Sequence, residues 1–166
     1  MRRRQFLRNF ALAIVAIAAA LYAWFTLSPW PSVLIIRHQF DADAAKRNAA
    51  LAKYVPEGIG AFYDRSYGDG NDEYMDVFFP SDQVEGGRRL PAVVWLHGGA
   101  FISGQKSDVT EYLKILAKHG YVTVAVDYSL APGAKYPAPV VQANQALAFI
   151  VADATRLHIE DRKSVV

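Results

Sequence analysis

Residues 97–101, His-Gly-Gly-Ala-Phe, are the stretch of this chain whose residue types and spacing could do chemistry. Four apolar residues precede them, Val93 to Leu96, and predict a strand buried on both faces of a parallel sheet. Glycine pairs occur where the backbone takes unusual dihedral angles or approaches a ligand closely. A backbone turned out at the carboxyl end of a buried strand can aim its N–H groups at an incoming oxygen. An oxyanion hole requires this arrangement.

A helix and a second strand are expected to position this loop. Apolar residues at i, i+3, i+4 and i+7 spacing predict a helix over Asp108–His119, capped by Ser107 and Asp108 and ended by Gly120. The run Tyr121–Asp127 predicts another buried strand. Strand, helix and strand in this order form a right-handed βαβ crossover.

The flanking segments extend this α/β pattern. Ala61–Tyr67 and Tyr74–Phe79 are rich in β-forming residues and are separated by a Gly/Asp turn cluster, which predicts an antiparallel hairpin. A second long helix is expected over Val140–Leu157, and Asp161–Val166 reads as a turn with the opening of one more strand. The fold class is therefore α/β, with a hairpin followed by a mostly parallel sheet.

Three motifs in this order resemble those of the hormone-sensitive-lipase-like carboxylesterases of the α/β-hydrolase superfamily. Residues 97–101 resemble the His-Gly-Gly-Gly oxyanion loop, residues 127–132 resemble the Asp-Tyr-Arg-Leu-Ala-Pro stretch, and residues 136–139 resemble the proline-rich entry to the next helix. Two positions depart from the family pattern: Ala100 replaces the third glycine, and Ser129 stands where arginine is usual.

The resemblance implies a Ser-His-Asp hydrolase of small carboxylic esters that needs no cofactor. It assigns the oxyanion hole to the backbone N–H groups of Gly98 and Gly99. Ala100 is a candidate third donor, in doubt because alanine disfavours positive φ. Gly104, outside this run, is expected to tolerate alanine. We expect loop-bracing or structural roles for His97, Asp127 and Tyr128.

The nucleophile of this family sits in Gly-x-Ser-x-Gly on the turn after the next strand, and residues 1–166 contain no such pentapeptide. The sequence therefore predicts the N-terminal part of an esterase, catalytically silent alone, with the serine within about ten residues after Val166. There are two alternatives. One is a membrane-tethered, hydrolase-like domain that binds a ligand but does not catalyse hydrolysis, and the other is a dinucleotide-binding βαβ unit. Bulky Phe101 and Ile102 and the late helix start disfavour the dinucleotide site.

The N-terminal region predicts a membrane segment. Asn9–Leu27 carries no charge and follows four arginines, which favours a membrane-spanning helix with a cytoplasmic N-terminus and an extracytoplasmic remainder. A cleaved twin-arginine export signal and a buried helix of a soluble protein are the alternatives. The expected division is an anchor or signal over residues 1–30, a connector with an amphipathic helix over Asp41–Tyr54 within residues 31–58, and a partial α/β-hydrolase domain over residues 59–166.

Composition excludes several other classes of function. Without the four N-terminal arginines, 14 basic face 16 acidic side chains, so no nucleic-acid footprint is expected. The chain has no cysteine, and its four histidines lack metal-ligand spacing, so no metal site is expected. Oligomeric state cannot be read from the sequence.

Overall fold

The computed structural model describes residues 2–165 and divides into two compact units, Met1–Ile36 and Arg37–Val166. The boundary between the two units falls inside the predicted connector of residues 31–58. Residues from Arg37 onward therefore belong to the same compact unit as the sheet. The division into anchor, connector and hydrolase domain stays a prediction.

The first unit contains helix α1, Arg2–Leu27, and the beginning of helix α2, Trp30–Leu51. The predicted end of the first helix at Leu27 is confirmed. The predicted start of the second helix at Asp41 is wrong, because α2 already begins at Trp30. Pro31 sits in its first turn, where a missing N–H is tolerated.

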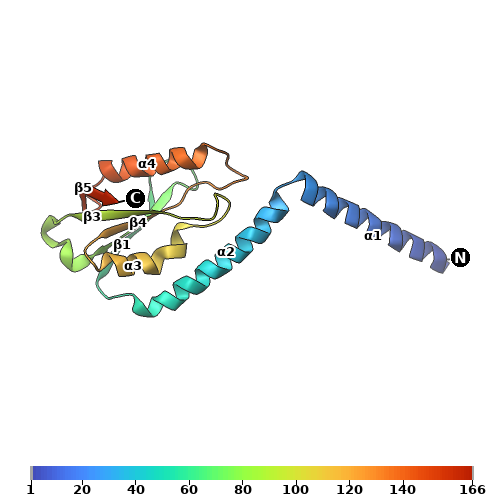
Figure 1. Ribbon diagram of the computed structural model, residues 1–166, viewed down its shortest axis with the longest axis horizontal. Coiled ribbons are helices and arrows are strands. Elements are labelled where there is room, and N and C mark those ends of the chain that lie inside the picture. The colour runs from blue at the N-terminus through green and yellow to red at the C-terminus, as the bar shows by residue number, and fades with distance from the viewer. Residues whose placement is uncertain (1, 166) are drawn as a thin grey trace. The chain divides into compact units, whose positions relative to one another are not determined.

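The second unit is built on a five-stranded sheet in the order β1-β2-β4-β3-β5 (Figure 1). Both neighbours of β3 are parallel to it, β4 on one side and β5 on the other, while β2 is antiparallel to both β1 and β4. The predicted hairpin and βαβ crossover are therefore confirmed. The strands are β1 Ile59–Ser66, β2 Tyr74–Pro80, β3 Leu90–Leu96, β4 Val122–Val126 and β5 Ile159–Val165.

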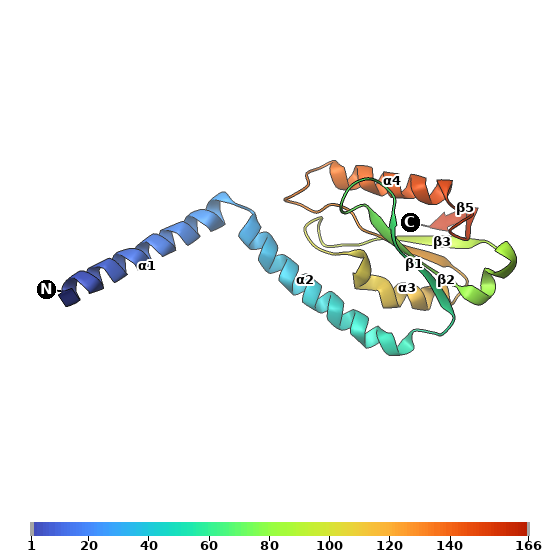
Figure 2. The ribbon, with the colours of Figure 1, turned by 180° about the vertical axis from the view of Figure 1, so that it is seen from behind.

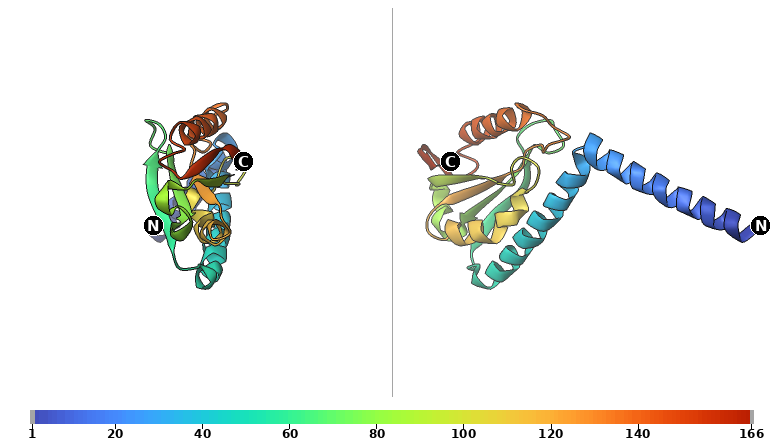
Figure 3. Two further views of the ribbon diagram at one scale, coloured as in Figure 1. Left: turned by 90° about the vertical axis from the view of Figure 1, so that its left-hand side faces the viewer. Right: turned by 45° about the vertical axis from the view of Figure 1, so that its right-hand side comes forward.

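Helices α3, Thr110–Ala117, and α4, Ala138–Ala152, cover opposite faces of the sheet (Figure 2 and Figure 3). The two hydrophobic clusters follow this division, with Leu113 of α3 packed in one cluster and Ile150 of α4 in the other. All five residues of β4 are buried between them. The sequence predicted that β3 is buried on both faces of the sheet. This prediction is wrong at Trp95, which is 37% exposed.

The observed ends of α3 and α4 also differ from the predicted ends. A 3₁₀ turn, Lys106–Val109, precedes α3, and its capping box is formed by Gln105 and Asp108 rather than by Ser107. Helix α4 begins at Ala138 and ends at Ala152, earlier at both ends than predicted. Shorter 3₁₀ turns lie at Ala52–Tyr54, Ser81–Gln83 and Glu85–Gly87.

The last strand is longer than the sequence indicated. It begins at Ile159 instead of near Asp161 and pairs alongside β3. The sequence predicted only the opening of a strand here; within the described residues, β5 is seven residues long and lies beside β3, which is an interior strand.

Candidate active site

The 97–104 loop leaves the carboxyl end of β3 and turns back within a few residues. The φ angles of Gly99, Ala100 and Phe101 are 112°, 54° and 59°, all in the left-handed half of φ space. The N–H groups of Ile102 and Ser103 both donate to the carbonyl oxygen of Gly99, at 3.0 and 3.1 Å. The backbone of this loop is therefore held by its own hydrogen bonds.

Three consecutive N–H groups in this loop are available to a ligand. Among the described residues, those of Gly98, Gly99 and Ala100 donate no hydrogen bond to a protein acceptor. Gly98 and Ala100 are exposed and Gly99 is half-buried, so the oxygen of water or of a ligand can accept from these N–H groups. This is the donor set from which an oxyanion hole can be made.

Each of these three N–H groups shares a peptide with the carbonyl of the residue before it, and each of those carbonyls is held by a polar contact. The Tyr128 hydroxyl donates to the His97 carbonyl, His97 Nδ1 lies 3.0 Å from the Gly98 carbonyl oxygen, and the Gly99 carbonyl accepts the two bonds described above. In a trans peptide the C=O and the following N–H point in opposite directions. Each anchored carbonyl therefore fixes the direction of one free N–H.

His97 braces the loop, as the resemblance implied. Its ring stacks on that of Tyr128 with centroids 4.2 Å apart and an interplanar angle of 6°. Both residues are buried, and burial raises the pKa of the Tyr128 hydroxyl, which keeps it protonated as a donor. Because a carbonyl oxygen can only accept, the contact with Gly98 places a proton on His97 Nδ1.

Alanine at position 100 does not prevent the turn. Ala100 adopts a φ of 54°, the left-handed conformation that alanine disfavours. Such a conformation costs an L-residue about 1–2 kcal/mol. The local hydrogen bonds of the loop offset this cost, so its three-donor form is compatible with the sequence.

The three glycines of the loop have different reasons for being glycine. A Cβ on Gly99 would lie 2.2 Å from the Ser103 carbonyl oxygen, and one on Gly104 would lie 2.4 Å from the Gly98 carbonyl oxygen. The expected tolerance of alanine at Gly104 is therefore wrong. A Cβ on Gly98 would meet no atom within 4 Å. The fold requires glycine at 99 and 104 but does not require it at 98.

The far end of the loop is tied to the hairpin by a buried ion pair. Lys106 Nζ lies 2.7 Å from one carboxylate oxygen of Asp76 and 2.7 Å from one of Asp64. Burial alone would lower the pKa of Lys106, but its hydrogen bonds to the two carboxylates outweigh burial and raise it. The N–H of Lys106 donates to Asp127 at the end of β4. Burial raises the pKa of Asp127, and this N–H partly opposes the rise.

Helix α2 also holds the loop, which the sequence did not indicate. Arg37 donates to the carbonyl oxygens of Ile102 and Ala131, and Asp41 accepts a hydrogen bond from Ser103 Oγ. The segment predicted as a connector with an amphipathic helix thus also contributes contacts to the loop. The spacing of Arg37 and Asp41, one helical turn apart, was the signal available in the sequence.

A cavity of about 210 Å³ adjoins the loop. Gly98 and Gly99 line it together with Phe40 of α2, Trp95 of β3 and Val109 before α3. Its place beside the free N–H groups makes it the candidate substrate site.

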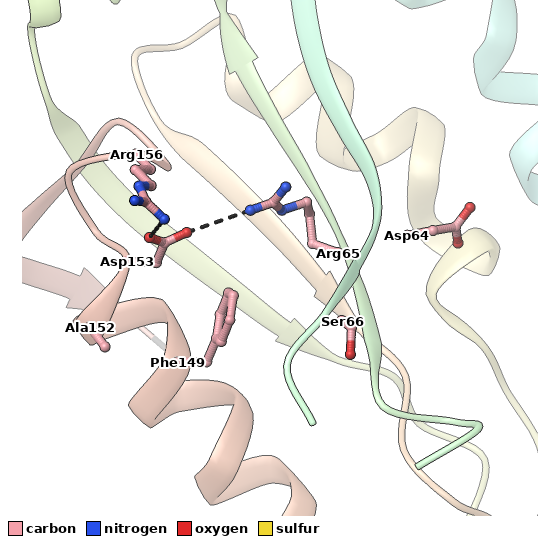
Figure 4. Close-up of a pocket in the computed structure, with 7 residues that line it drawn as sticks. All are labelled: Asp64, Arg65, Ser66, Phe149, Ala152, Asp153 and Arg156. Carbon is pink, nitrogen blue, oxygen red and sulfur yellow. Dashed lines mark ion pairs between the residues drawn. The ribbon is translucent and has the colours of Figure 1, made fainter. Parts of the chain in front are cut away.

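A larger cavity of about 490 Å³ lies elsewhere in the same unit, between β1 and the end of α4 (Figure 4). Asp153 lies 3.7 Å from Arg65 and 3.5 Å from Arg156, so one carboxylate engages both arginines. No residue of the 97–104 loop lines this cavity. Within the described residues, no group of three metal-ligating side chains is placed to hold a metal ion.

A comparison with models of protein families shows to which family the chain belongs. The model of the family named BD-FAE matches residues 75–166, which include the hairpin's second strand, the 97–104 loop and both helices over the sheet. The chain belongs to the BD-FAE family. Its relatives include carboxylesterases of the α/β-hydrolase superfamily, as the sequence motifs indicated.

Individual relatives agree with this family. The chain is 27% identical over 106 residues to Esterase LipQ of Mycobacterium tuberculosis, covering 63% of this chain and 23% of that protein. It is 33% identical over 72 residues to Probable carboxylesterase 11 of Arabidopsis thaliana, covering 42% of this chain and 16% of that one. The solved structure of a bacterial heroin esterase has a TM-score of 0.67 and 25% identity, covering 87% of this chain and 45% of that one.

The chain thus spans less than half the length of each of these relatives. The similarity supports a carboxylesterase-type function at the level of the family.

Proposed function

We propose that this chain is the N-terminal part of a serine carboxylesterase that acts on small esters, with an oxyanion hole made by the N–H groups of Gly98, Gly99 and Ala100. The observation that supports it is the set of three free N–H groups at the carboxyl end of β3, each directed by an anchored carbonyl.

The order of the strands supports a position for the nucleophilic serine close to the 97–104 loop. Because β5 is parallel and adjacent to β3, the carboxyl ends of both strands meet at one edge of the sheet. In the family, the nucleophilic serine follows this strand on a sharp turn. A serine placed there would attack the ester carbonyl while a histidine accepts its proton. The negative charge formed on the carbonyl oxygen would then be stabilised by the three N–H groups.

The test uses the full-length protein and the substitution Gly98→Ala. Position 98 accepts a Cβ without a clash, so the variant should fold, while its methyl group would stand in the cavity beside the donors. Displacing the oxyanion from one donor is expected to lower kcat about 10²-fold. The control is Gly133→Ala, where the nearest atom to the new Cβ lies at an ordinary 3.5 Å and no part of the 97–104 loop is touched.

The assay is hydrolysis of p-nitrophenyl acetate, with covalent labelling by a serine-directed phosphonate. We expect turnover and labelling for the wild type and for Gly133→Ala. No turnover above a heat-denatured sample would reject the esterase and favour a binding domain. Equal activity of Gly98→Ala and wild type would reject the oxyanion assignment alone.

We also propose that α1 anchors the protein in a membrane with its N-terminus in the cytoplasm. Residues Arg3–Leu27 have a mean hydropathy of 2.2 over their most apolar window, long and apolar enough to cross a bilayer, and none of that window is buried within the protein. Arginines at positions 2, 3, 4 and 8 favour this orientation. An alkaline phosphatase fused after Asp41 should be active and membrane-bound. Activity in the soluble periplasmic fraction would indicate a cleaved signal, and an inactive fusion would reject export.

A further inference from the structure

We propose that Arg37 and Asp41 of helix α2 form a clamp that keeps the 97–104 loop in its donor geometry, with Arg37 as a positioning residue for ester hydrolysis. The effect on hydrolysis depends on the proposed function, whereas the effect on the loop does not.

The Arg37 guanidinium joins two loops at the carboxyl edge of the sheet. Its Nε donates to the Ile102 carbonyl oxygen, and its Nη2 donates to the Ala131 carbonyl oxygen at 2.9 Å. The same two loops are joined directly, because the Ala131 N–H donates to the Phe101 carbonyl oxygen at 2.7 Å. A planar guanidinium presents its donors in a fixed fork, so one side chain can hold two carbonyls at a set separation.

Asp41 holds the next residue of the same loop. Ser103 Oγ donates to Asp41 Oδ1 at 3.1 Å, and the Ser103 side chain has only 1% of its surface exposed. Arg37 and Asp41 are four residues apart, so they lie on one face of α2. Ala44, the next residue on that face, is 3% exposed. Arg37 is half-buried and Asp41 is exposed, so the clamp lies beside the packed face of the helix.

The clamp acts on the residues that orient one donor. Ile102 and Ser103 provide both hydrogen bonds to the Gly99 carbonyl oxygen. The Gly99 carbonyl belongs to the same peptide as the Ala100 N–H, and the two point in opposite directions. Loosening Ile102 or Ser103 would free this peptide to rotate, and Ala100 has a conformational reason to leave its positive φ.

A neighbouring residue on the same helix provides a matched comparison. Asn48 donates to the Ser107 carbonyl oxygen and accepts from the Glu111 N–H, both at 3.0 Å. It thus ties α2 to the start of α3, and it does not contact the 97–104 loop. Removing Asn48 tests the attachment of α2, whereas removing Arg37 tests the clamp.

The first measurement is hydrogen–deuterium exchange resolved by residue. In Arg37→Gln we expect the amides of Ile102 and Ser103, which donate to the Gly99 carbonyl oxygen, to exchange at least about tenfold faster than in the wild type, because their local opening becomes easier. Asn48→Ala should instead accelerate exchange at the first turn of α3. Ser103→Ala, a smaller change that removes only the Asp41 bond, should reproduce the effect on the Ile102 amide if Arg37→Gln fails to fold.

The second measurement is ester hydrolysis by the full-length protein. An oxyanion donor acts mainly in the transition state, so Arg37→Gln should lower kcat about tenfold or more and change KM little. Arg37→Lys keeps the charge but carries its donors on a single nitrogen, so it should recover part of kcat. Asn48→Ala should lower the melting temperature while kcat is preserved. Lys46→Gln, an exposed cation on the same helix, should change neither.

The outcomes separate the two proposals. Unchanged exchange of the Ile102 and Ser103 amides in Arg37→Gln, and of the Ile102 amide in Ser103→Ala, would overturn the clamp. Faster exchange together with an unchanged kcat would overturn the positioning role. Faster exchange in a full-length protein with no esterase activity would support the clamp and reject the proposed function.

Discussion

Replacing Lys106 with methionine should destabilise the fold far more than removing its exposed partner. Methionine keeps most of the aliphatic stem but leaves the Asp76 carboxylate, whose side chain is only 5% exposed, without a cation. Removing one partner of a buried ion pair costs about 3–5 kcal/mol. Asp76 still accepts the Asp64 N–H at 2.9 Å, so we place the cost near the lower end, about 3 kcal/mol.

Removing the charge of the exposed partner in the same cluster should change the stability of the fold much less. The Asp64 side chain is 73% exposed, although it lies as close to Lys106 as Asp76 does. Ion pairs that are open to solvent contribute about 0–1 kcal/mol, so Asp64→Asn should cost less than about 1 kcal/mol. The double variant Lys106→Met/Asp76→Asn should be more stable than Lys106→Met alone, because it contains no unpaired buried carboxylate.

Equilibrium urea unfolding of the full-length protein, followed by tryptophan fluorescence, measures these differences. Equal destabilisation by Lys106→Met and Asp64→Asn would refute the argument that burial sets the strength of this pair. A double variant less stable than Lys106→Met would refute the claim that an unpaired carboxylate is the source of the cost.

Three further outcomes are expected. Gly99→Ala should prevent the loop from forming and lower the melting temperature, whereas Gly98→Ala should melt as the wild type does. Ala100→Gly should change kcat little, because the N–H keeps its direction; a large gain in kcat would show that alanine distorts the hole. Burial raises the pKa of Asp127, so its ionised form destabilises the fold above that pKa. Urea unfolding should therefore find Asp127→Asn more stable at pH 7, with the advantage disappearing below about pH 4.

The strands, the hairpin and the βαβ crossover were accessible to sequence reasoning because their signal is strong and local. Val122–Val126 lies between two helix layers, so four of its five residues are apolar, Thr123 being the exception, and the run stands out. A hairpin turn and a βαβ crossover then leave few topologies. Trp95 was misjudged because an apolar residue type does not reveal which face of a strand is covered.

The role of α2 was not accessible in the same way. Its anchoring side chains are polar, and their partners, two carbonyl groups and the Ser103 hydroxyl, are more than sixty residues away in the sequence. Helical periodicity reports apolar faces, and here only Ala44 marks the packed side between Arg37 and Asn48. Polar residues on an alanine-rich helix are typical of a solvated surface, so the segment looked like a connector.

The alanine at position 100 shows why a motif alone could not settle the geometry of this loop. The third glycine of the family pattern suggests that backbone freedom makes the hole. Here the direction of each N–H is set by what holds the carbonyl before it: Tyr128 after β4, the ring of His97, and the turn at Ile102 that Arg37 secures. With the carbonyls anchored from three places, a residue that disfavours the turn can still occupy it. The donor geometry is thus a property of the whole second unit, and substitutions far from residue 100 should alter it.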